Sequence, residues 1–458
     1  MSKHLLLILM LFAWRTLNAQ NEIIEKYVHE GLENNLALKQ QQFSLQKSLQ
    51  ALKEARGMFL PAIGIEARYS KAGGGRLIDI PVGDLMNPVY HTLNQILQAV
   101  GEPPAFPAGI ENQTIPFLRE QEHETKIRLI QPIFQPAIYY KYKIMSNLNH
   151  VRQAEMATFK RQLIGDIKKA YFNYLKAARV IKIYDETYLL LKENLRVSEK
   201  LFQHHKATEE VVFRAKAEIA ELQQQQAEAE KNMKLAAAYF NFLINRPLDS
   251  PIESVNESLP MFETELSLPQ AEARALEHRV EFQQLQSAIE AAQNNARLSI
   301  SAFLPGVTGV FDYGFQGEKY KFTEKDDFWM GSIVLHWNLF NGFQDKSKHE
   351  QALLEKNKLT TQLMELEAKI KLQVQEAYDN LIVARKSIVS ADERLNSARE
   401  SFRIVSKKYE QGMVPQIEYT NARTMFTNAE INKAIARYDY HVKFAVFEQV
   451  AALQRIDF

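Results

Sequence analysis

The chain has 458 residues, of which 46% are hydrophobic and 24% charged, and its 56 basic and 55 acidic side chains nearly cancel. This composition excludes an intrinsically disordered chain and a general binder of nucleic acid. Because cysteine is absent, disulfide scaffolds, thiolate metal sites and an acylated N-terminal cysteine are also excluded. Between Pro136 and Pro247 there is no further proline and only one glycine, so long helices are expected.

Residues 1–19 have the pattern of a secretory signal peptide. Lys3 and His4 precede an apolar run from Leu5 to Ala13, and the small residue Ala19 stands before Gln20. The apolar run is too short to span a bilayer, so we predict cleavage after Ala19, with a buried N-terminal core helix as the alternative. No run of eighteen or more apolar residues occurs after Ala19, so no transmembrane helix is predicted there. The mature chain is therefore expected to be either a soluble protein or a β-barrel protein.

Much of the sequence occurs twice. The segments Phe59-Leu60-Pro61 and Phe303-Leu304-Pro305 lie 244 positions apart, whereas Tyr171 and Tyr378 lie 207 apart. The change in offset places a length difference in the glycine- and proline-rich stretch 71–122. Long, internally varied copies indicate a duplicated domain. We predict a first structural repeat at residues 20–268 and a second at residues 269–458.

Each repeat is predicted to contain two strands, at about 62–70 and 123–134 and at about 306–316 and 328–340. Apolar and polar side chains alternate along them, as in Ile63, Ile65 and Tyr69 against Glu66 and Arg68. Strands of this length with aromatic ends are typical of membrane strands that face lipid on one side and water on the other. An ordinary soluble sheet is the alternative. Because four strands cannot close a barrel, closure would require several chains.

The two strands of the first repeat are joined by the stretch 71–122, which holds six prolines. We predict it to be an extracellular loop with a short helical piece near His91 to Val100.

Helical hairpins are predicted at residues 136–247 and 342–455. Apolar residues follow alternating steps of four and three from Ala377 to Val405 and from Ala215 to Leu243, which is a heptad pattern. The first helix of each hairpin approaches seventy residues, or about 100 Å at 1.5 Å per residue. Short breaks at 204–208 and 412–415 mark the hairpin tips.

These features resemble the TolC family of trimeric outer-membrane efflux ducts over essentially the whole mature chain. The residues that carry the resemblance are the duplicated Phe-Leu-Pro segments, Leu339-Phe340-Asn341-Gly342 and Tyr409-Glu410-Gln411-Gly412. The resemblance implies a mainly α fold with a membrane β-barrel part. In it, a homotrimer forms a 12-stranded β-barrel that is continued by a long α-helical coiled-coil tunnel.

The resemblance also implies a function. The chain would be a passive exit duct in the outer membrane of a Gram-negative bacterium, with a periplasmic extension. It would carry small molecules or polypeptides, and its partners would be outer-membrane lipid, a periplasmic adaptor protein and an inner-membrane pump. A secreted or surface-attached coiled-coil structural protein without transport activity is the alternative. Lipid-facing aromatic residues such as Trp329 and Trp337 favour the duct.

By the same resemblance, the second hairpin tip holds the pore entrance. Tyr409 matches a family tyrosine, Glu418 falls where an outer ring of acidic residues would be, and Asn421 makes the inner ring neutral. Val414 stands at the family's arginine position and Val211 at that of its aspartate partner. The usual locking network is therefore expected to be missing.

The two tips are predicted to dock the adaptor protein. The tip residues singled out for this contact are His205, Lys206, Gly412, Met413, Val414 and Pro415.

No catalytic, cofactor or metal site is predicted. His204 and His205 are adjacent on a helix and so face about 100° apart, which makes them poor joint metal ligands. The sequence contains no metalloprotease, phosphate-loop or nucleophile-elbow motif. Energy for transport would therefore come from partner proteins.

Overall fold

The computed structural model describes residues 22–254 and 266–454, so the predicted signal peptide lies outside the described residues. The chain divides into two compact units. The strand unit consists of Lys53–Tyr142 and Ala296–His349, and the helical unit contains the rest. Among the described helices, none has a stretch both long and apolar enough to cross a bilayer.

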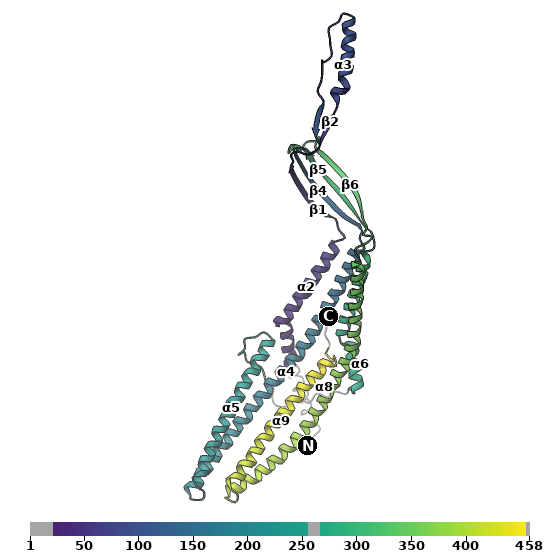
Figure 1. Ribbon diagram of the computed structural model, residues 1–458. Helices are drawn as coiled ribbons and strands as arrows, with labels where there is room; N and C mark the ends of the chain where they lie inside the picture. Colours follow the sequence, from purple (N-terminus) through teal and green to yellow (C-terminus); the bar gives the residue numbers. More distant parts are fainter. Residues whose placement is uncertain (1–21, 255–265, 455–458) are drawn as a thin grey trace, which may run out of the picture. The chain divides into compact units, whose positions relative to one another are not determined.

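The strand unit is built on an antiparallel four-stranded sheet with the order β1-β4-β5-β6 (Figure 1). Its strands are β1 (Ala62–Lys71), β4 (Gln121–Phe134), β5 (Gly306–Gly317) and β6 (Asp327–His336). The last strand ends at His336, not at the expected residue 340. His336 pairs with Gly306, the first residue of β5. Pro305 precedes that residue and has no N–H to continue the ladder, so the chain beyond His336 leaves the sheet.

One face of this sheet is apolar and exposed. Ile65, Ile127, Tyr313 and Trp329 lie side by side across the four strands. Ile65 is 76% exposed and Trp329 is 73% exposed. A large apolar surface of this kind is rare on soluble monomers and marks a contact with lipid or another protein.

The opposite face is charged and internally paired. The guanidinium of Arg128 donates to both carboxylate oxygens of Asp312, at 2.8 and 2.7 Å, and Lys126 donates to Glu124 at 2.8 Å. Asp312 is fully buried by these contacts. The alternation in the sequence thus separates an apolar face from a polar face.

The stretch 71–122 folds as a two-stranded ribbon and a helix. Strands β2 (Leu77–Ile80) and β3 (Gln113–Pro116) pair, and α3 (Val82–Ala99) lies between them in sequence. The helix begins nine residues before the expected His91. Asn112 stabilises this start because its side-chain oxygen accepts a hydrogen bond from the Asp84 amide at 3.1 Å. Asn87 likewise binds both backbone groups of Ile110.

The remaining described helices include a segment at residues 22–34 followed by the longer elements. These are α2 (Leu36–Gly57), α4 (Pro136–Gln203), α5 (Glu210–Leu243), α6 (Leu268–His278), α7 (Glu281–Ser301), α8 (Gln344–Glu410) and α9 (Gln416–Val450). The helical stretch at the start of the described chain is interrupted at Asn35. Its side chain accepts from the Leu38 amide at 2.8 Å and donates to the Leu243 carbonyl, so it caps a new helix.

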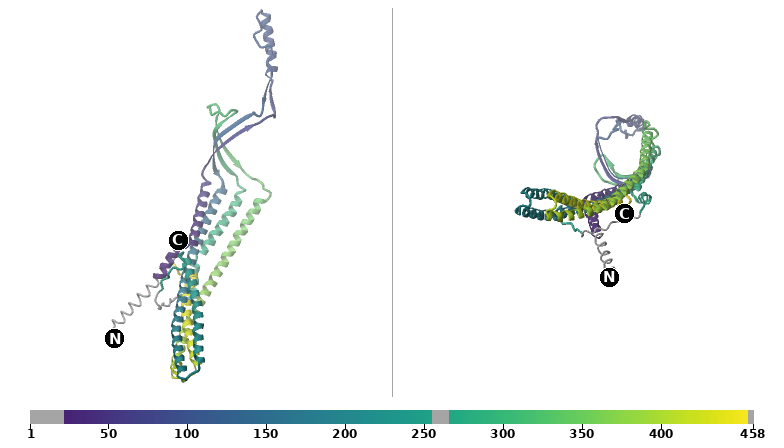
Figure 2. Two further views of the ribbon diagram at one scale, coloured as in Figure 1. Left: turned by 90° about the vertical axis from the view of Figure 1, so that its left-hand side faces the viewer. Right: turned by 90° about the horizontal axis from the view of Figure 1, so that it is seen from below.

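Helices α4 and α5 form one antiparallel hairpin and α8 and α9 form a second, and the two lie side by side in both views (Figures 1 and 2). Their cores contain residues that correspond at an offset of 207 positions. Phe240 packs edge to face on Tyr27 with ring centroids 4.9 Å apart, and Phe447, 207 positions later, is also fully buried. The predicted seam from Ala377 to Val405 is buried as far as Ala398, and its last two members, Phe402 and Val405, are half-buried. The seam from Ala215 to Leu243 consists of buried and half-buried members.

Candidate functional site

The two hairpin tips have the same backbone geometry. His205 and Gly412, 207 positions apart, both have left-handed φ angles, of 56° and 72°. In each tip the amide of the next residue donates a hydrogen bond to the carbonyl five positions earlier. Lys206 donates to the Leu201 carbonyl at 2.8 Å, and Met413 donates to the Lys408 carbonyl at 2.9 Å. This pattern terminates helices and favours glycine at the left-handed position.

A cavity of about 730 Å³ lies between the tips. It brings together five of the six predicted docking residues, namely Lys206, Gly412, Met413, Val414 and Pro415. Val211 also lines the cavity, and its backbone carbonyl accepts a hydrogen bond from the Gln416 side chain at 3.0 Å. His205 adjoins the cavity but is not part of its lining.

Tyr409 lies inside the helical packing, with only 5% of its surface exposed. Its ring stacks on Tyr419 with centroids 4.9 Å apart, and its hydroxyl is 3.4 Å from the hydroxyl of Ser198 on α4. Burial raises the pKa of Tyr419 to about 12, so its hydroxyl stays protonated at physiological pH. Tyr409 therefore joins the second hairpin to the first by packing.

Glu418 and Asn421 are exposed on the first turns of α9. Within the described part of the chain, the Glu418 carboxylate forms no ion pair, so it carries an uncompensated negative charge. At the equivalent positions of α5 the chain has Val211 and Arg214, and the latter pairs with Glu210. The acidic position is thus confined to the second hairpin.

An ion pair that the sequence does not predict joins the two hairpins. Arg423 on α9 lies 3.3 Å from Glu218 on α5, and both side chains are only 10% exposed. The hydroxyl of Thr420 donates to the other Glu218 oxygen at 2.7 Å. No local signal identifies this pair, because its members are 205 positions apart and each is an ordinary charged residue of a heptad helix.

Among residues 22–254 and 266–454, no three metal-binding side chains come together. The arrangement at the tips offers hydrogen bonds, apolar contacts and exposed carboxylates, among them those of Glu410 and Glu418. These groups suit docking and the passage of ions or solutes.

The second repeat is similar to a known family. Residues 273–450 match the model of the outer membrane efflux protein family. No curated protein matches the chain significantly in sequence.

Several solved structures share the fold. The outer-membrane channel OprN is 13% identical over 96% of this chain and 91% of its own, with a TM-score of 0.77. The Campylobacter jejuni CmeC outer membrane channel is 15% identical over 94% and 85%, with a TM-score of 0.74. The Vibrio cholerae outer membrane protein VceC is 13% identical over 93% and 95%, with a TM-score of 0.75.

Proposed function

We propose that the chain is a passive exit duct. Residues 273–450 match the model of the outer membrane efflux protein family, and over most of its length the chain has the fold of outer-membrane channels. It acts in the outer membrane, with its helical unit in the periplasm, as part of a tripartite efflux or type I secretion system. An adaptor protein and an inner-membrane pump deliver its cargo of small molecules or polypeptides.

The observation that carries this proposal is the two-sided sheet. The row formed by Ile65, Ile127, Tyr313 and Trp329 is suited to lipid, whereas the face that holds Arg128 and Asp312 is suited to water. The alternative, a structural coiled-coil protein, would leave this apolar face in contact with water. Lipid contact gives it a favourable environment.

The duct is a homotrimer. In the described sheet, β1 and β6 each have an unpaired edge, and such edges cannot remain unsatisfied in a bilayer. Three copies supply twelve strands, so that β1 of one copy pairs with β6 of the next. Apolar side chains exposed on α5 and α8 support further contacts between copies. They include Phe213, Leu235, Phe242, Met364, Leu372 and Val383, each at least 60% exposed.

The two repeats, 20–268 and 269–458, are copies of one unit, and each contributes two strands to the barrel and one helical hairpin to the tunnel. The shared tip geometry of His205 and Gly412 supports the duplication. The stretch 71–122 is the extracellular part. The cavity between the hairpin tips, with the adjoining His205, docks the adaptor protein.

The pore entrance is formed by the start of α9. Glu418 gives one ring of three carboxylates, Asn421 gives a neutral ring, and Tyr409 supports both through its packing on Tyr419. The family's usual locking residues are replaced by Val211 and Val414. Glu218 and Arg423 hold the closed state instead, because they tie α5 to α9.

Two lysine substitutions on one strand test the membrane assignment. Tyr313→Lys places a charge on the apolar face of β5, where it costs about 2–4 kcal/mol near the bilayer midplane. Gln316→Lys places the same charge on the polar face of that strand. Fractionation should find only the Tyr313 variant depleted from the outer membrane. Equal insertion of both variants would reject the lipid-facing assignment.

A further inference from the structure

Helix α3 carries a heptad seam that is largely exposed. Its members follow alternating steps of three and four, and we refer to them as the α3 seam: Val82, Leu85, Val89, Thr92, Ile96 and Ala99. Leu85 is 68% exposed, Val89 is 48% exposed and Ile96 is 56% exposed. Seams of this spacing pack against the seam of another helix, because both helices then bury apolar surface.

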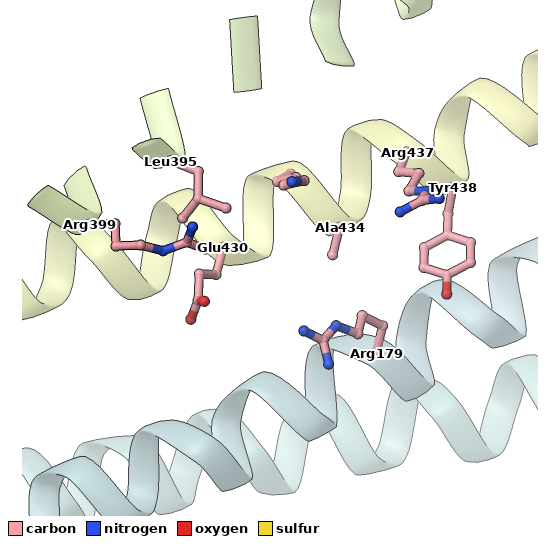
Figure 3. A pocket seen from close by; sticks show the side chains of 8 residues that line it. Arg179, Leu395, Arg399, Glu430, Ala434, Arg437 and Tyr438 are labelled. Carbon is pink, nitrogen blue, oxygen red and sulfur yellow. The ribbon is translucent and has the colours of Figure 1, made fainter. Parts of the chain in front are cut away.

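The heptad seams of the helical unit show what such a contact looks like. Leu395 of α8 is buried and belongs to one apolar cluster with Ala429 of α9. Figure 3 shows the Leu395 side chain pointing from α8 toward α9. In the part of the chain that the structure describes, the exposed members of the α3 seam have no such neighbour. Their partner is therefore to be sought outside the single chain.

The opposite face of α3 is attached to the stretch 101–112, which follows the helix. The ring of Tyr90 stacks on that of Phe106 with centroids 5.6 Å apart. The Asn94 side chain forms two hydrogen bonds with the backbone of Phe106, both at 3.0 Å. These contacts hold α3 in one orientation, so the α3 seam stays on the outside.

The charges of this region discriminate between possible partners. There is no lysine or arginine from Leu77 to Leu118, and the one acidic residue of α3 is Asp84. Amphipathic helices that lie in a membrane interface are rich in basic side chains, which bind anionic lipid. The composition of α3 therefore disfavours a membrane surface as the partner.

Identical helices can approach this face without repulsion. The positions that flank the α3 seam are all uncharged, and they are held by Met86, Pro88, Leu93, Gln95 and Val100. Pro88 removes one backbone hydrogen bond inside the helix, but it lies beside the seam and replaces none of its members. The face is thus suited to a second copy of itself.

We propose that the α3 helices of the three chains in one duct pack through the α3 seam and form a short coiled coil. The proposal rests on the proposed homotrimer, whose threefold symmetry gives each seam two identical neighbours. The three helices run in the same direction, because each continues from β1 of its own chain. β-Branched residues at every other seam position, Val82, Val89 and Ile96, are typical of parallel coiled coils. Attachment to one barrel gives these short helices a high effective concentration.

Cysteine cross-linking of the full-length protein in detergent tests the contact. The chain has no cysteine, so each substitution introduces the only thiol. Ile96→Cys lies in the seam, whereas Gln98→Cys lies on an exposed part of α3 outside it. A short bifunctional maleimide should produce at least tenfold more covalent dimer from the Ile96 variant, as seen on denaturing gels. Equal yields from the two variants would overturn the proposal.

Dilution shows whether the cross-links form inside one trimer. Their yield should stay the same after a tenfold dilution of the protein. A yield that falls on dilution would mean that separate ducts collide through α3, which contradicts the proposed coiled coil.

Labelling with a monofunctional maleimide measures whether the seam is covered. Because Ile96 is 56% exposed in the single chain, a thiol there should react as fast as one at Gln98 unless another helix covers it. We expect the Ile96 variant to react at least tenfold more slowly. Equal rates would reject the contact. Slow labelling without cross-linking would mean that detergent covers the seam, and it would also reject the contact.

Native mass spectrometry of the same samples separates this proposal from the one on which it rests. A trimer whose Ile96 variant does not cross-link would overturn the coiled coil and leave the duct assignment intact. A monomer would overturn both.

Discussion

Arg423 and Glu218 form the one ion pair among the described residues that joins α5 to α9, at 3.3 Å. Each partner is nearly buried, so removing either one leaves the other as an unpaired charge in a poorly hydrated place. Such a loss costs roughly 3 kcal/mol, the lower end of the range for buried pairs. If the proposed duct opens by separation of its two hairpins, that energy favours the closed state.

The first prediction concerns this pair. Glu218→Gln should loosen the contact between the hairpins and raise the channel conductance in planar bilayers several-fold. The exchange of both residues, Glu218→Arg with Arg423→Glu, should restore low conductance because the attraction is regained. Glu228→Gln, an exposed member of a pair with Lys231 on the same helix, is the control. Conductance that is equal in the single variant and the control would contradict a locking role.

The second prediction concerns the backbone of the tips. A β-branched residue is disfavoured at the left-handed φ of Gly412, so Gly412→Val should cost about 1–2 kcal/mol locally and distort the docking surface. Export should be lost while trimer assembly and membrane insertion persist, as native gels and fractionation would show. His205→Gly relieves the same conformation at the other tip, so it should leave trimer assembly and membrane insertion intact. Normal export by the Gly412 variant would remove the docking assignment.

The sequence predicts a large part of this fold because its signals are local. Heptad spacing identifies α8 and α9, and the alternation around Tyr313 identifies a one-sided strand. The features that it misses depend on distant residues. Asn112 caps α3 from 28 positions away, and the pairing of Gly306 with His336 ends β6.

Some features of the candidate site could likewise be predicted from local sequence signals, whereas others depend on distant residues. The breaks at the tips were predictable from helix-ending residues such as Gly412 and Pro415. The ion pair between Glu218 and Arg423 was not, because a heptad pattern shows which residues are buried but not which polar residues meet across two hairpins. The burial of Tyr409 against Tyr419 likewise depends on the packing of α8 on α9.

The third prediction follows from His441 in the helical unit. Its ring is fully buried and stacks on Phe172 at 5.0 Å, and burial, with the positive charge of Arg437, lowers its pKa to about 4. In the unfolded chain a histidine has a pKa of about 6.5. A histidine whose pKa is lower in the folded state contributes its full stability at pH values above about 6.5, and this contribution is lost as the pH falls from about 6.5 toward 4. The loss is up to about 3 kcal/mol.

His441→Phe cannot titrate, so its free energy of unfolding should change less between pH 7 and pH 4.5 than that of the unmodified protein. Denaturant unfolding of the helical signal at both pH values measures this difference. His29→Phe removes an exposed histidine and serves as the control. If the His441 variant is as sensitive to acid as the unmodified protein, another group is responsible for acid destabilisation.

The fourth prediction is that Glu418 sets the ion selectivity of the entrance. Three exposed carboxylates that converge on a narrow pore concentrate negative potential, which attracts cations and repels anions. Glu418→Gln should therefore lower the cation selectivity and weaken block by trivalent metal ions. Asn421→Asp adds a second acidic ring one turn away and should raise both.

The reversal potential of single channels in a salt gradient measures the selectivity. Because both side chains are exposed, neither substitution should change trimer assembly, which native mass spectrometry can verify in the same samples. Glu410→Gln, at the end of α8, removes an acidic residue of the tip outside the proposed ring and is the matched control. If Glu418→Gln and Glu410→Gln shift the reversal potential equally, ion selectivity depends only on the total charge of the tip. The proposed ring would then be wrong.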